Sequence, residues 1–413
     1  MSCFCIYFFN FICYTIITMN NNIKFVLHTI FHASAVVLSS GAVIQAFMLY
    51  LGISEGDISL YSSLIQFAQV SMMLVFAFVG DKFKTVKKII FLFALALPSL
   101  FIFLLIAVSP LTPTLESKYL VILIGSILVN LVLGAYNVLC YKLPYSIINM
   151  SDYGHLTAIG GILAGILSIT LTSLLSYFTA NFDYLLVISI AFILGAVLWT
   201  LSALFIKFCK EIELPQTEEK AKTSFISFIK QPVFYKLLPA HIFRGIANGI
   251  FLLVAVIGAS DGVLNSQTII ALSLVTSISS MVGNWLYSVL ERKIKPDKLI
   301  ILSALLFALT VLGLGIFKDL WLYFTLFFIA NASNVVLGVC VPVIVVQRVD
   351  YEYIGKYTSW RMLLFTGASA LPGLFLGSML ESVSSLLPLT ICALLMFVAC
   401  LMYSVIEKKP LQK

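Results

Sequence analysis

Apolar runs of about 20 residues recur along the chain, separated by short polar breaks. A helix of that length crosses a hydrocarbon core of about 30 Å with every backbone polar group bonded internally. Charged residues make up only 10% of the 413 residues, against about 25% in a soluble domain. We therefore predict an all-α integral membrane protein with twelve transmembrane helices. The predicted spans are residues 25–51, 57–80, 87–108, 118–141, 155–180, 184–209, 237–259, 266–290, 298–317, 320–346, 356–380 and 384–406.

The two halves of the chain repeat one phrase deep inside their apolar runs. It reads Asn130-Leu-Val-Leu-Gly134 in the first half and Asn334-Val-Val-Leu-Gly338 in the second. Two further pairs of similar segments follow nearly the same spacing: residues 81–90 and 291–300, and residues 154–157 and 355–358. Three matches in order indicate a duplication, so we predict two six-helix pseudo-repeats. Parallel repeats with a solute site near the membrane midplane are typical of one large class of transporters.

Basic residues gather in alternate loops of the predicted topology. They cluster after the second and the eighth predicted spans and at the chain end, whereas the opposite loops hold only Lys118 and Lys318. Such an asymmetry across short loops marks the cytoplasmic side. We therefore expect a protein of the plasma (inner) membrane with both termini in the cytoplasm. Because this topology accounts for the net charge of +7, nucleic acid is not an expected partner.

The polar breaks also define the predicted domains. These are an N-terminal segment at 1–24, an N-terminal six-helix bundle at 25–209, a cytoplasmic linker at 210–236, a C-terminal six-helix bundle at 237–406 and a cytoplasmic tail at 407–413. Residues 1–18 are apolar without a basic residue, which is unlike a signal peptide. Met19 begins a more natural N-terminus, so we interpret them as an over-extended start. A surface-lying segment or a thirteenth helix stays open as an alternative.

Polar side chains form stripes on six of the predicted helices, with steps of three, four or seven residues that place each set roughly on one face. The stripes are His28, His32 and Ser39; Ser62, Gln66 and Gln69; Asn130 and Asn137; His241, Arg244 and Asn248; Ser273, Ser277, Ser280 and Asn284; and Asn331 and Asn334. A polar group inside a membrane is costly unless it faces protein or water, so six stripes indicate a shared aqueous cavity. The alternative is that these residues bond neighbouring helices together.

Arg244 is the deepest basic side chain in any predicted span. When the two repeats are aligned so that Lys24 pairs with Lys236, Arg244 pairs with His32. We therefore predict a substrate-binding site made of His32, Asn130, Arg244, Asn248 and Asn334. Because a guanidinium suits bidentate recognition of carboxylate or phosphate, the expected substrate is a small polar, anionic solute. The alternative is that Arg244 snorkels to lipid headgroups or braces the cytoplasmic loops.

The loop after the second predicted span reads Ala77-Phe-Val-Gly80-Asp81-Lys82-Phe83-Lys84-Thr85-Val86-Lys87-Lys88. It resembles the hallmark loop of the major facilitator superfamily, which runs Gly, three residues, Asp, Arg or Lys, one residue, Gly, and two basic residues. The acid, the base after it and the final basic pair fit this pattern with two residues inserted. Ala77 and Lys84 stand where the family has glycine.

A weaker copy of the loop, Glu291-Arg292, follows the eighth predicted span. With the twelve spans and the linker, the resemblance covers nearly the whole chain and implies a secondary transporter that works by alternating access. It also implies a gating role for Asp81 and Lys82 at the cytoplasmic ends of the two halves. The repeat extends this role to Glu291 and Arg292. The alternative is that the basic cluster only sets the topology.

The chain carries no nucleophile elbow, Walker loop, dinucleotide fingerprint or metalloprotease signature. We therefore expect no enzymatic activity, no catalytic residue, no cofactor and no metal site. The expected partners are a small-molecule solute and membrane lipid, with the protein functional as a monomer. No acid lies in the middle of a predicted span, so the four histidines are the remaining titratable candidates, and a proton is the candidate coupling ion.

Two other functions stay open. One is an efflux pump for hydrophobic compounds or drugs, because 33 Phe and 18 Tyr can line an apolar pocket. The segment Gly160-Gly161-Ile-Leu-Ala-Gly165 weighs against it, since it lacks the proline that drug antiporters of the superfamily usually carry in the fifth helix. The other is a non-transporting membrane sensor or assembly partner, for which we would expect a substantial extra soluble domain.

Overall fold

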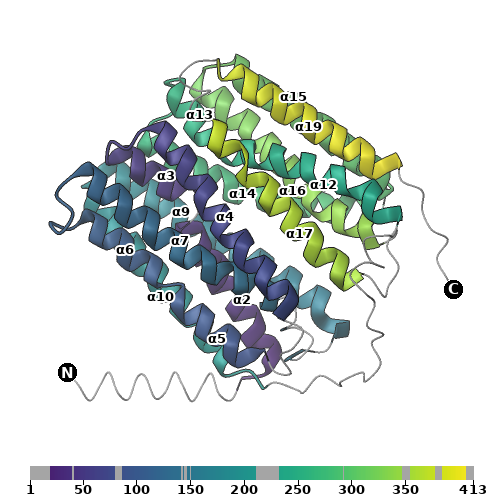
Figure 1. Ribbon diagram of the computed structural model, residues 1–413, viewed down its shortest axis with the longest axis horizontal. Helices are drawn as coiled ribbons and strands as arrows, with labels where there is room; N and C mark the ends of the chain where they lie inside the picture. Colours follow the sequence, from purple (N-terminus) through teal and green to yellow (C-terminus); the bar gives the residue numbers. More distant parts are fainter. Residues whose placement is uncertain are drawn as a thin grey trace. The chain divides into compact units, whose positions relative to one another are not determined.

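The computed structural model describes residues 19–39, 41–79, 86–140, 143, 147–148, 150–210, 232–291, 293–346, 354–376 and 384–405. This part of the chain is built from α-helices joined by short turns (Figure 1), which confirms the all-α class. The helices are α2 (Asn21–Leu38), α3 (Gly41–Tyr50), α4 (Glu55–Val79), α5 (Lys87–Ala96), α6 (Ser99–Val108), α7 (Leu115–Cys140), α9 (Met150–Asn181), α10 (Tyr184–Lys207), α12 (Pro232–Leu252), α13 (Val254–Ser260), α14 (Ser266–Leu290), α15 (Pro296–Ile316), α16 (Leu320–Val346), α17 (Ile354–Ala370) and α19 (Leu386–Val405).

Ten helical segments of the described part are long and apolar enough to cross a membrane. The pair Phe234–Leu252 and Val254–Ser260, bent by 46°, is an eleventh if it is counted as one span. The predicted span at 356–380 corresponds to a shorter apolar helix, Trp360–Leu376. Each of the twelve predicted spans therefore overlaps an apolar helix, while the count of twelve full-length spans stays a prediction.

The chain packs as two compact units. Unit 1 contains residues 1–40 and 71–216, and unit 2 contains residues 41–70 and 217–413. In this division α3 and the first part of α4 group with the helices of the second half of the sequence. The predicted bundles at 25–209 and 237–406 follow the sequence repeat and stay a prediction, as does the linker, most of which lies outside the described residues.

In unit 1, α2 packs against both α9 and α10, while α5 and α6 lie between α7 and α10. Two lysines from other helices close the C-terminal end of α10. Lys24 donates from its Nζ to the Phe208 carbonyl at 2.7 Å, and Lys87 donates to the Cys209 carbonyl at 2.8 Å. The last carbonyls of a helix have no hydrogen-bond partner within it and lie at the negative end of its dipole. The two lysines supply both hydrogen bonds and positive charge there.

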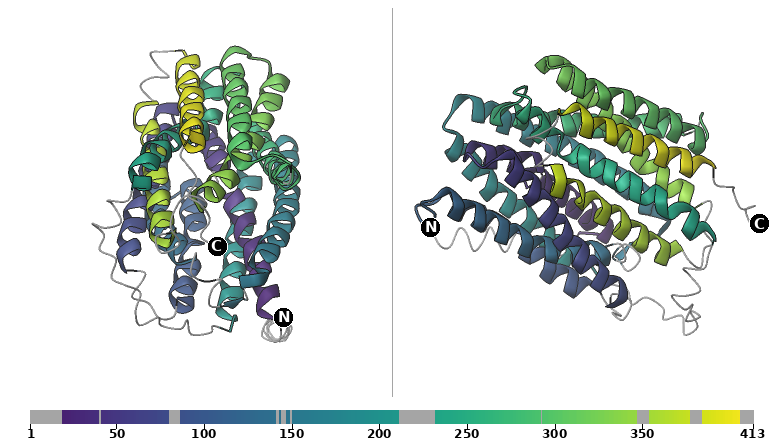
Figure 2. Two further views of the ribbon diagram at one scale, coloured as in Figure 1. Left: turned by 90° about the vertical axis from the view of Figure 1, so that its right-hand side faces the viewer. Right: turned by 45° about the horizontal axis from the view of Figure 1, so that its top comes forward.

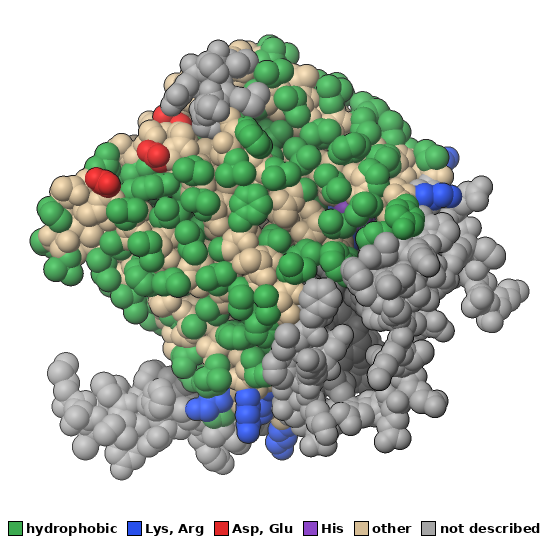
Figure 3. All heavy atoms as spheres, in the orientation of Figure 1, with side chains coloured by type: hydrophobic (Ala, Val, Ile, Leu, Met, Phe, Trp, Pro, Cys, Tyr) green, Lys and Arg blue, Asp and Glu red, His purple; other side chains and the backbone are tan. Residues whose placement is uncertain are grey.

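The described part of the face in Figure 3 is largely apolar. In Figure 3 hydrophobic side chains cover most of the visible face, and Lys and Arg side chains lie at its edge. In unit 1, Ile102, Leu186 and Ile193 expose more than half of their surface. Exposed aliphatic side chains along whole helices fit a surrounding of lipid rather than water. Together with the apolar spans, this makes the chain an integral membrane protein.

In unit 2, α12 lies between α17 and α19, and α15 lies between α16 and α19 (Figures 1 and 2). Two glycines one turn apart on α12, Gly245 and Gly249, face backbone carbonyls of α17. A side chain at Gly249 would collide with the Ser369 carbonyl oxygen, and one at Gly245 with the Phe365 carbonyl oxygen. The G-x-x-x-G spacing thus lets two membrane helices approach at backbone distance.

This close approach predicts a specific loss of stability. Gly249→Ala forces α12 away from a carbonyl that cannot rotate aside, so we expect it to cost about 1–3 kcal/mol, as overpacking does. Gly161→Ala on α9 is the control, because open space surrounds that position and alanine is the better helix former by up to about 1 kcal/mol. Thermal unfolding of the purified variants measures both. Equal melting temperatures for the two variants would contradict the contact.

Candidate functional site

Arg244 lies on α12 with 8% of its surface exposed. Its guanidinium stacks over the Phe365 ring of α17, 4.8 Å from the ring centre. The Nη2 atom lies beside Gly338 of α16, 3.7 Å from where a Cβ would stand. Among the described residues its buried Nε has no hydrogen-bond partner. Arg244 is thus a buried cation that has a cation–π contact but no paired charge within the part of the chain that the structure describes.

Two asparagines extend this site along α12 and α16. Asn248 lies one turn after Arg244, and Asn334 lies one turn before Gly338. The Asn334 Nδ2 stands 3.5 Å from the Asn248 Oδ1, at the outer limit of a hydrogen bond. Both side chains are half-buried. Unit 2 therefore brings together three of the five predicted substrate-binding residues, and each keeps hydrogen-bonding capacity.

The other two predicted residues lie in unit 1. The His32 ring packs on the Tyr136 ring at 5.2 Å and on the His28 ring at 5.7 Å, measured between ring centres. Asn130 donates from Nδ2 to the Ser126 carbonyl of its own helix at 2.8 Å. That these two residues share one cavity with Arg244 stays a prediction.

Each unit also holds a buried histidine in a hydrogen-bonded network. In unit 1 the Nδ1 of His28 meets the Ser202 Oγ at 2.7 Å, and its Nε2 meets the Tyr136 hydroxyl at 3.3 Å. In unit 2 the Nε2 of His241 meets the Tyr357 hydroxyl at 2.6 Å, and its Nδ1 meets the Tyr403 hydroxyl. Sequence reasoning missed these tyrosines, because among 18 tyrosines their spacing marks none of them.

Other residues of the polar stripes bond helices. Asn331 on α16 donates from Nδ2 to the Ser279 Oγ at 2.8 Å, the Ser280 Oγ at 3.1 Å and the Thr276 carbonyl at 3.2 Å, all on α14. Ser277 and Asn284 donate to carbonyls of their own helix. For Asn331 the structure favours the alternative of bonding between helices over a role in an aqueous cavity.

Three of the four predicted gating residues, Asp81, Lys82 and Arg292, lie outside the described residues. The fourth, Glu291, caps the C-terminal end of α14, where its N–H donates to the Tyr287 carbonyl at 2.9 Å. Its side chain is exposed. The gating role of all four residues stays a prediction.

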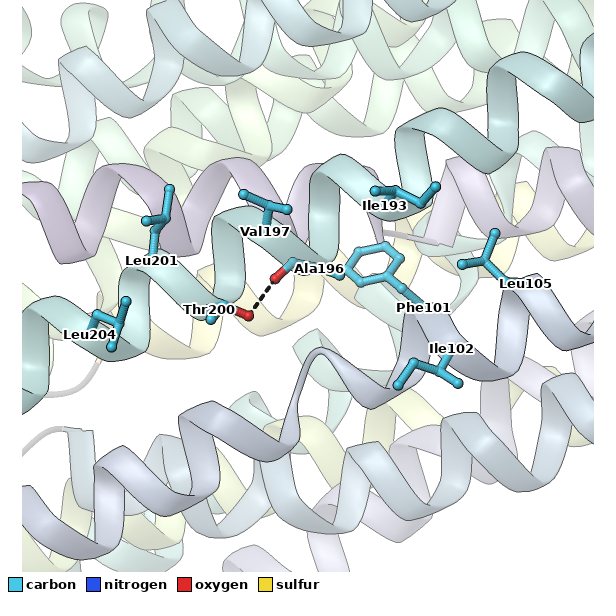
Figure 4. Close-up of a pocket in the computed structure, with 9 residues that line it drawn as sticks. All are labelled: Phe101, Ile102, Leu105, Ile193, Ala196, Val197, Thr200, Leu201 and Leu204. Atoms are coloured by element: carbon cyan, nitrogen blue, oxygen red, sulfur yellow. Dashed lines mark hydrogen bonds between the residues drawn. The ribbon is translucent and has the colours of Figure 1, made fainter. Parts of the chain in front are cut away.

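An apolar pocket of about 400 Å³ lies between α6 and α10 in unit 1 (Figure 4). Its single polar side chain, Thr200, donates to the Ala196 carbonyl of its own helix at 2.8 Å. Two of its lining residues, Ile102 and Ile193, are more than half exposed, so the pocket opens on the apolar outer surface. Without a charge or a spare donor, it offers nothing to recognise a polar solute.

Comparison with known proteins identifies the family. Residues 3–373 match the family model of the Major Facilitator Superfamily, so the chain belongs to this family of membrane transporters. Among curated proteins the chain has no match. The fold resembles solved structures of the nucleoside transporter NupG, at a TM-score of 0.64 and 16% identity over 93% of this chain and 98% of that one. It also resembles a D-xylose-proton symporter, at a TM-score of 0.72 and 12% identity over 94% of this chain and 97% of that one.

Asn331 and Asn334 on α16 test which polar residues join helices and which bind the solute. We expect Asn331→Ala to lower the melting temperature, because it removes bonds to α14 worth about 0.6 kcal/mol each on average in membrane proteins. Asn334→Ala should leave stability nearly unchanged, because its hydrogen bond to Asn248 is long, and should reduce solute uptake if the residue binds solute. Thermal unfolding and uptake by proteoliposomes measure the two effects. The opposite pattern would show that Asn334 is the structural residue.

Proposed function

We propose that this chain is a secondary active transporter that moves a small polar, anionic solute across the membrane by alternating access. The observation that supports an anion is Arg244, a buried guanidinium whose Nε has no hydrogen-bond partner among the described residues. Family membership supports transport, and the likeness to structures of a nucleoside transporter and a sugar symporter, both at low identity, supports the fold alone.

Placing the charge of Arg244 inside a membrane span costs free energy, so another group is needed to balance it. An arginine at the centre of a membrane helix costs about 2.5–3.5 kcal/mol on insertion scales. The acids in the described candidate spans are Glu55, Asp57, Glu116 and Asp297, each in the first turn of its helix. None of these lies deep in a span. An anionic solute would supply the missing charge during the transport cycle.

Snorkelling to headgroups accounts less well for Arg244. The residue lies ten positions after Phe234 in the apolar segment Phe234–Leu252, which is about 15 Å along a helix. Its side chain stacks inward on α17 and approaches α16 instead of reaching along its own helix. A planar guanidinium can stack on an aromatic ring and also form bidentate bonds to carboxylate or phosphate.

The remaining predicted residues complete the proposed site. Asn248 and Asn334 offer neutral donors and acceptors beside Arg244, and we propose that His32 and Asn130 do the same from the first half. For gating we propose Asp81, Lys82, Glu291 and Arg292 at the cytoplasmic ends of the helices. The proposed location is the plasma (inner) membrane, with both termini in the cytoplasm.

Removing the guanidinium tests the substrate class. Uptake by proteoliposomes is screened with carboxylates, sulfonates, phosphate esters, sugars and nucleosides as candidate solutes. We expect the transported solute to be one of the anions. Arg244→Lys should weaken its binding by about tenfold or more, the scale of one lost charge-assisted hydrogen bond. Lys236→Ala on the same helix is the control, because that side chain is exposed.

Unchanged affinity in Arg244→Ala, in protein that folds normally, would remove both the site and the anionic substrate class. If the protein exports hydrophobic dyes and Arg244→Ala does not change this export, the efflux function is favoured instead.

The gate has its own test. Asp81→Asn keeps the size of the side chain but loses its charge, and with it an interaction of about 1–3 kcal/mol on the scale of hydrogen bonds to charged groups. We expect slower transport with little change in solute binding, because the contact would form in only one state of the cycle. Initial uptake rates and equilibrium binding, measured on equally expressed protein, separate the two. If Asp81→Asn takes up solute at the parental rate, the basic cluster after α4 only sets the topology.

A further inference from the structure

The apolar pocket between α6 and α10 in unit 1 is a groove that follows one face of α10 (Figure 4). Four of its lining residues lie on α10 at steps of three or four, which places them in one stripe along the helix: Ile193, Val197, Thr200 and Leu204. From Ile193 to Leu204 this stripe is about 16 Å long. Half of a hydrocarbon core of about 30 Å is about 15 Å, so the groove has the length of one membrane leaflet.

A proline and a glycine shape the wall that faces α10. Pro98 separates α5 from α6, because it lacks the N–H that would bond the carbonyl four residues earlier in a continuous helix. After this break the Phe101 ring lies on the backbone of α10 at Gly195, where a Cβ would collide with the ring. At the end beside Ile193 the groove is therefore lined by residues of both helices, as Figure 4 shows.

A lysine stands at the other end of the groove. Lys207 lies three residues after Leu204, so it is the next residue of the same stripe. Its side chain is exposed, and its Nζ lies 5.4 Å from the centre of the Phe91 ring of α5. Lys88, which is also exposed, lies three residues before Phe91 on α5, where i and i+3 side chains are neighbours. Two exposed cations thus flank one aromatic ring beyond Leu204.

Further lysines make this end of α10 strongly positive. Lys24 and Lys87 bond the carbonyls of Phe208 and Cys209 there. The helices α2, α5 and α10 contain no acidic residue, and the acid that caps α10, Asp183, lies at its opposite end. A ligand that follows the groove therefore meets an apolar lining along its length and positive charge at one end.

We propose that this groove binds one anionic glycerophospholipid. One acyl chain lies along α10 between Ile193 and Leu204, and the headgroup phosphate lies at Lys207. The length of the groove fits the chain of a single leaflet. The lining suits it as well, because the one polar side chain, Thr200, already bonds its own helix. The lysines select a negative headgroup, as basic pockets beside membrane helices do. This site is separate from the proposed solute site and does not depend on the solute.

Lipid titration of the purified full-length protein tests the headgroup. Dioleoyl phosphatidylglycerol and dioleoyl phosphatidylcholine share their acyl chains and differ in net charge, and native mass spectrometry counts the lipids bound. We expect one phosphatidylglycerol to bind at least about fivefold more tightly than phosphatidylcholine, the scale of one lysine near a membrane surface. Equal affinity for the two lipids would overturn the proposal.

A variant pair tests the groove itself. Ala196 lines the groove and is half-buried, so Ala196→Phe places a ring where the acyl chain would lie. We expect it to weaken the binding of both lipids by about tenfold or more, because the chain loses its contacts with the lining. Leu194→Phe is the matched control, since Leu194 is exposed on the same helix and lies outside the groove. If Ala196→Phe binds both lipids as the unmodified protein does, the groove is not the site.

A second pair tests the cation. Lys207→Gln keeps a polar side chain of similar length but removes the charge, so we expect the preference for phosphatidylglycerol to fall by about fivefold. Phosphatidylcholine binding should stay unchanged. Lys236→Gln on α12 is the control, because Lys236 is an exposed lysine of unit 2. A full preference in Lys207→Gln would contradict the place of the headgroup.

A cross-link in the unmodified protein gives a result that does not depend on how the variants fold. Phosphatidylglycerol with a photoactivatable diazirine in one acyl chain is incorporated into nanodiscs with the protein, and the labelled peptides are mapped. We expect labelling at residues 193–204 and 101–105 to exceed that at other exposed apolar positions, such as Leu302 and Leu309 of α15. Equal labelling of both faces would show that lipid surrounds the protein without a preferred site and would overturn the proposal.

Discussion

The rest of the structure depends on one constraint, that a polar group inside an apolar protein in a membrane must find its partner within the protein. The buried polar residues mostly obey it. Lys24 reaches a helix-terminal carbonyl, Asn331 joins α14 to α16, and His28 and His241 each engage both ring nitrogens. Arg244 is one of the exceptions, because its buried Nε has no hydrogen-bond partner in the described part of the chain. A cation left incompletely paired at this cost is what a binding site for a negative group requires.

The duplication explains part of this pattern. In each unit a histidine on the first helix of a repeat bonds a hydroxyl on the last helix, Ser202 for His28 and Tyr403 for His241. The two copies then differ in charge. The predicted alignment of the repeat, which pairs Lys24 with Lys236, places His28 one residue out of register with His241 and pairs Arg244 with His32, which stacks on Tyr136.

The sequence predicts the membrane class and the approximate spans because the length and apolarity of a span are properties of single segments. It does not predict the breaks and bends, such as the one at Leu253, because they depend on packing between helices. The same holds for the polar stripes. Spacing places Asn331 and Asn334 one turn apart on α16, yet only the opposite helix shows that Asn331 bonds α14 while Asn334 stays nearly unbonded. Residues such as Phe365 leave no signal at all, because one phenylalanine among 33 looks like any other.

The helix α17 connects these features physically. Its backbone touches α12 at Gly249, its Phe365 ring lies under Arg244, and its Tyr357 bonds His241. On another side, the Ser369 hydroxyl bonds the Gln66 amide oxygen of α4, and both residues belong to unit 2. Because Gly249 leaves no slack between α12 and α17, a sliding of one helix along the other would change the aromatic contact and the histidine bond together. Contacts to Arg244, His241 and Gln66 are thus all made by α17, so one helix connects the proposed site to its neighbours within unit 2.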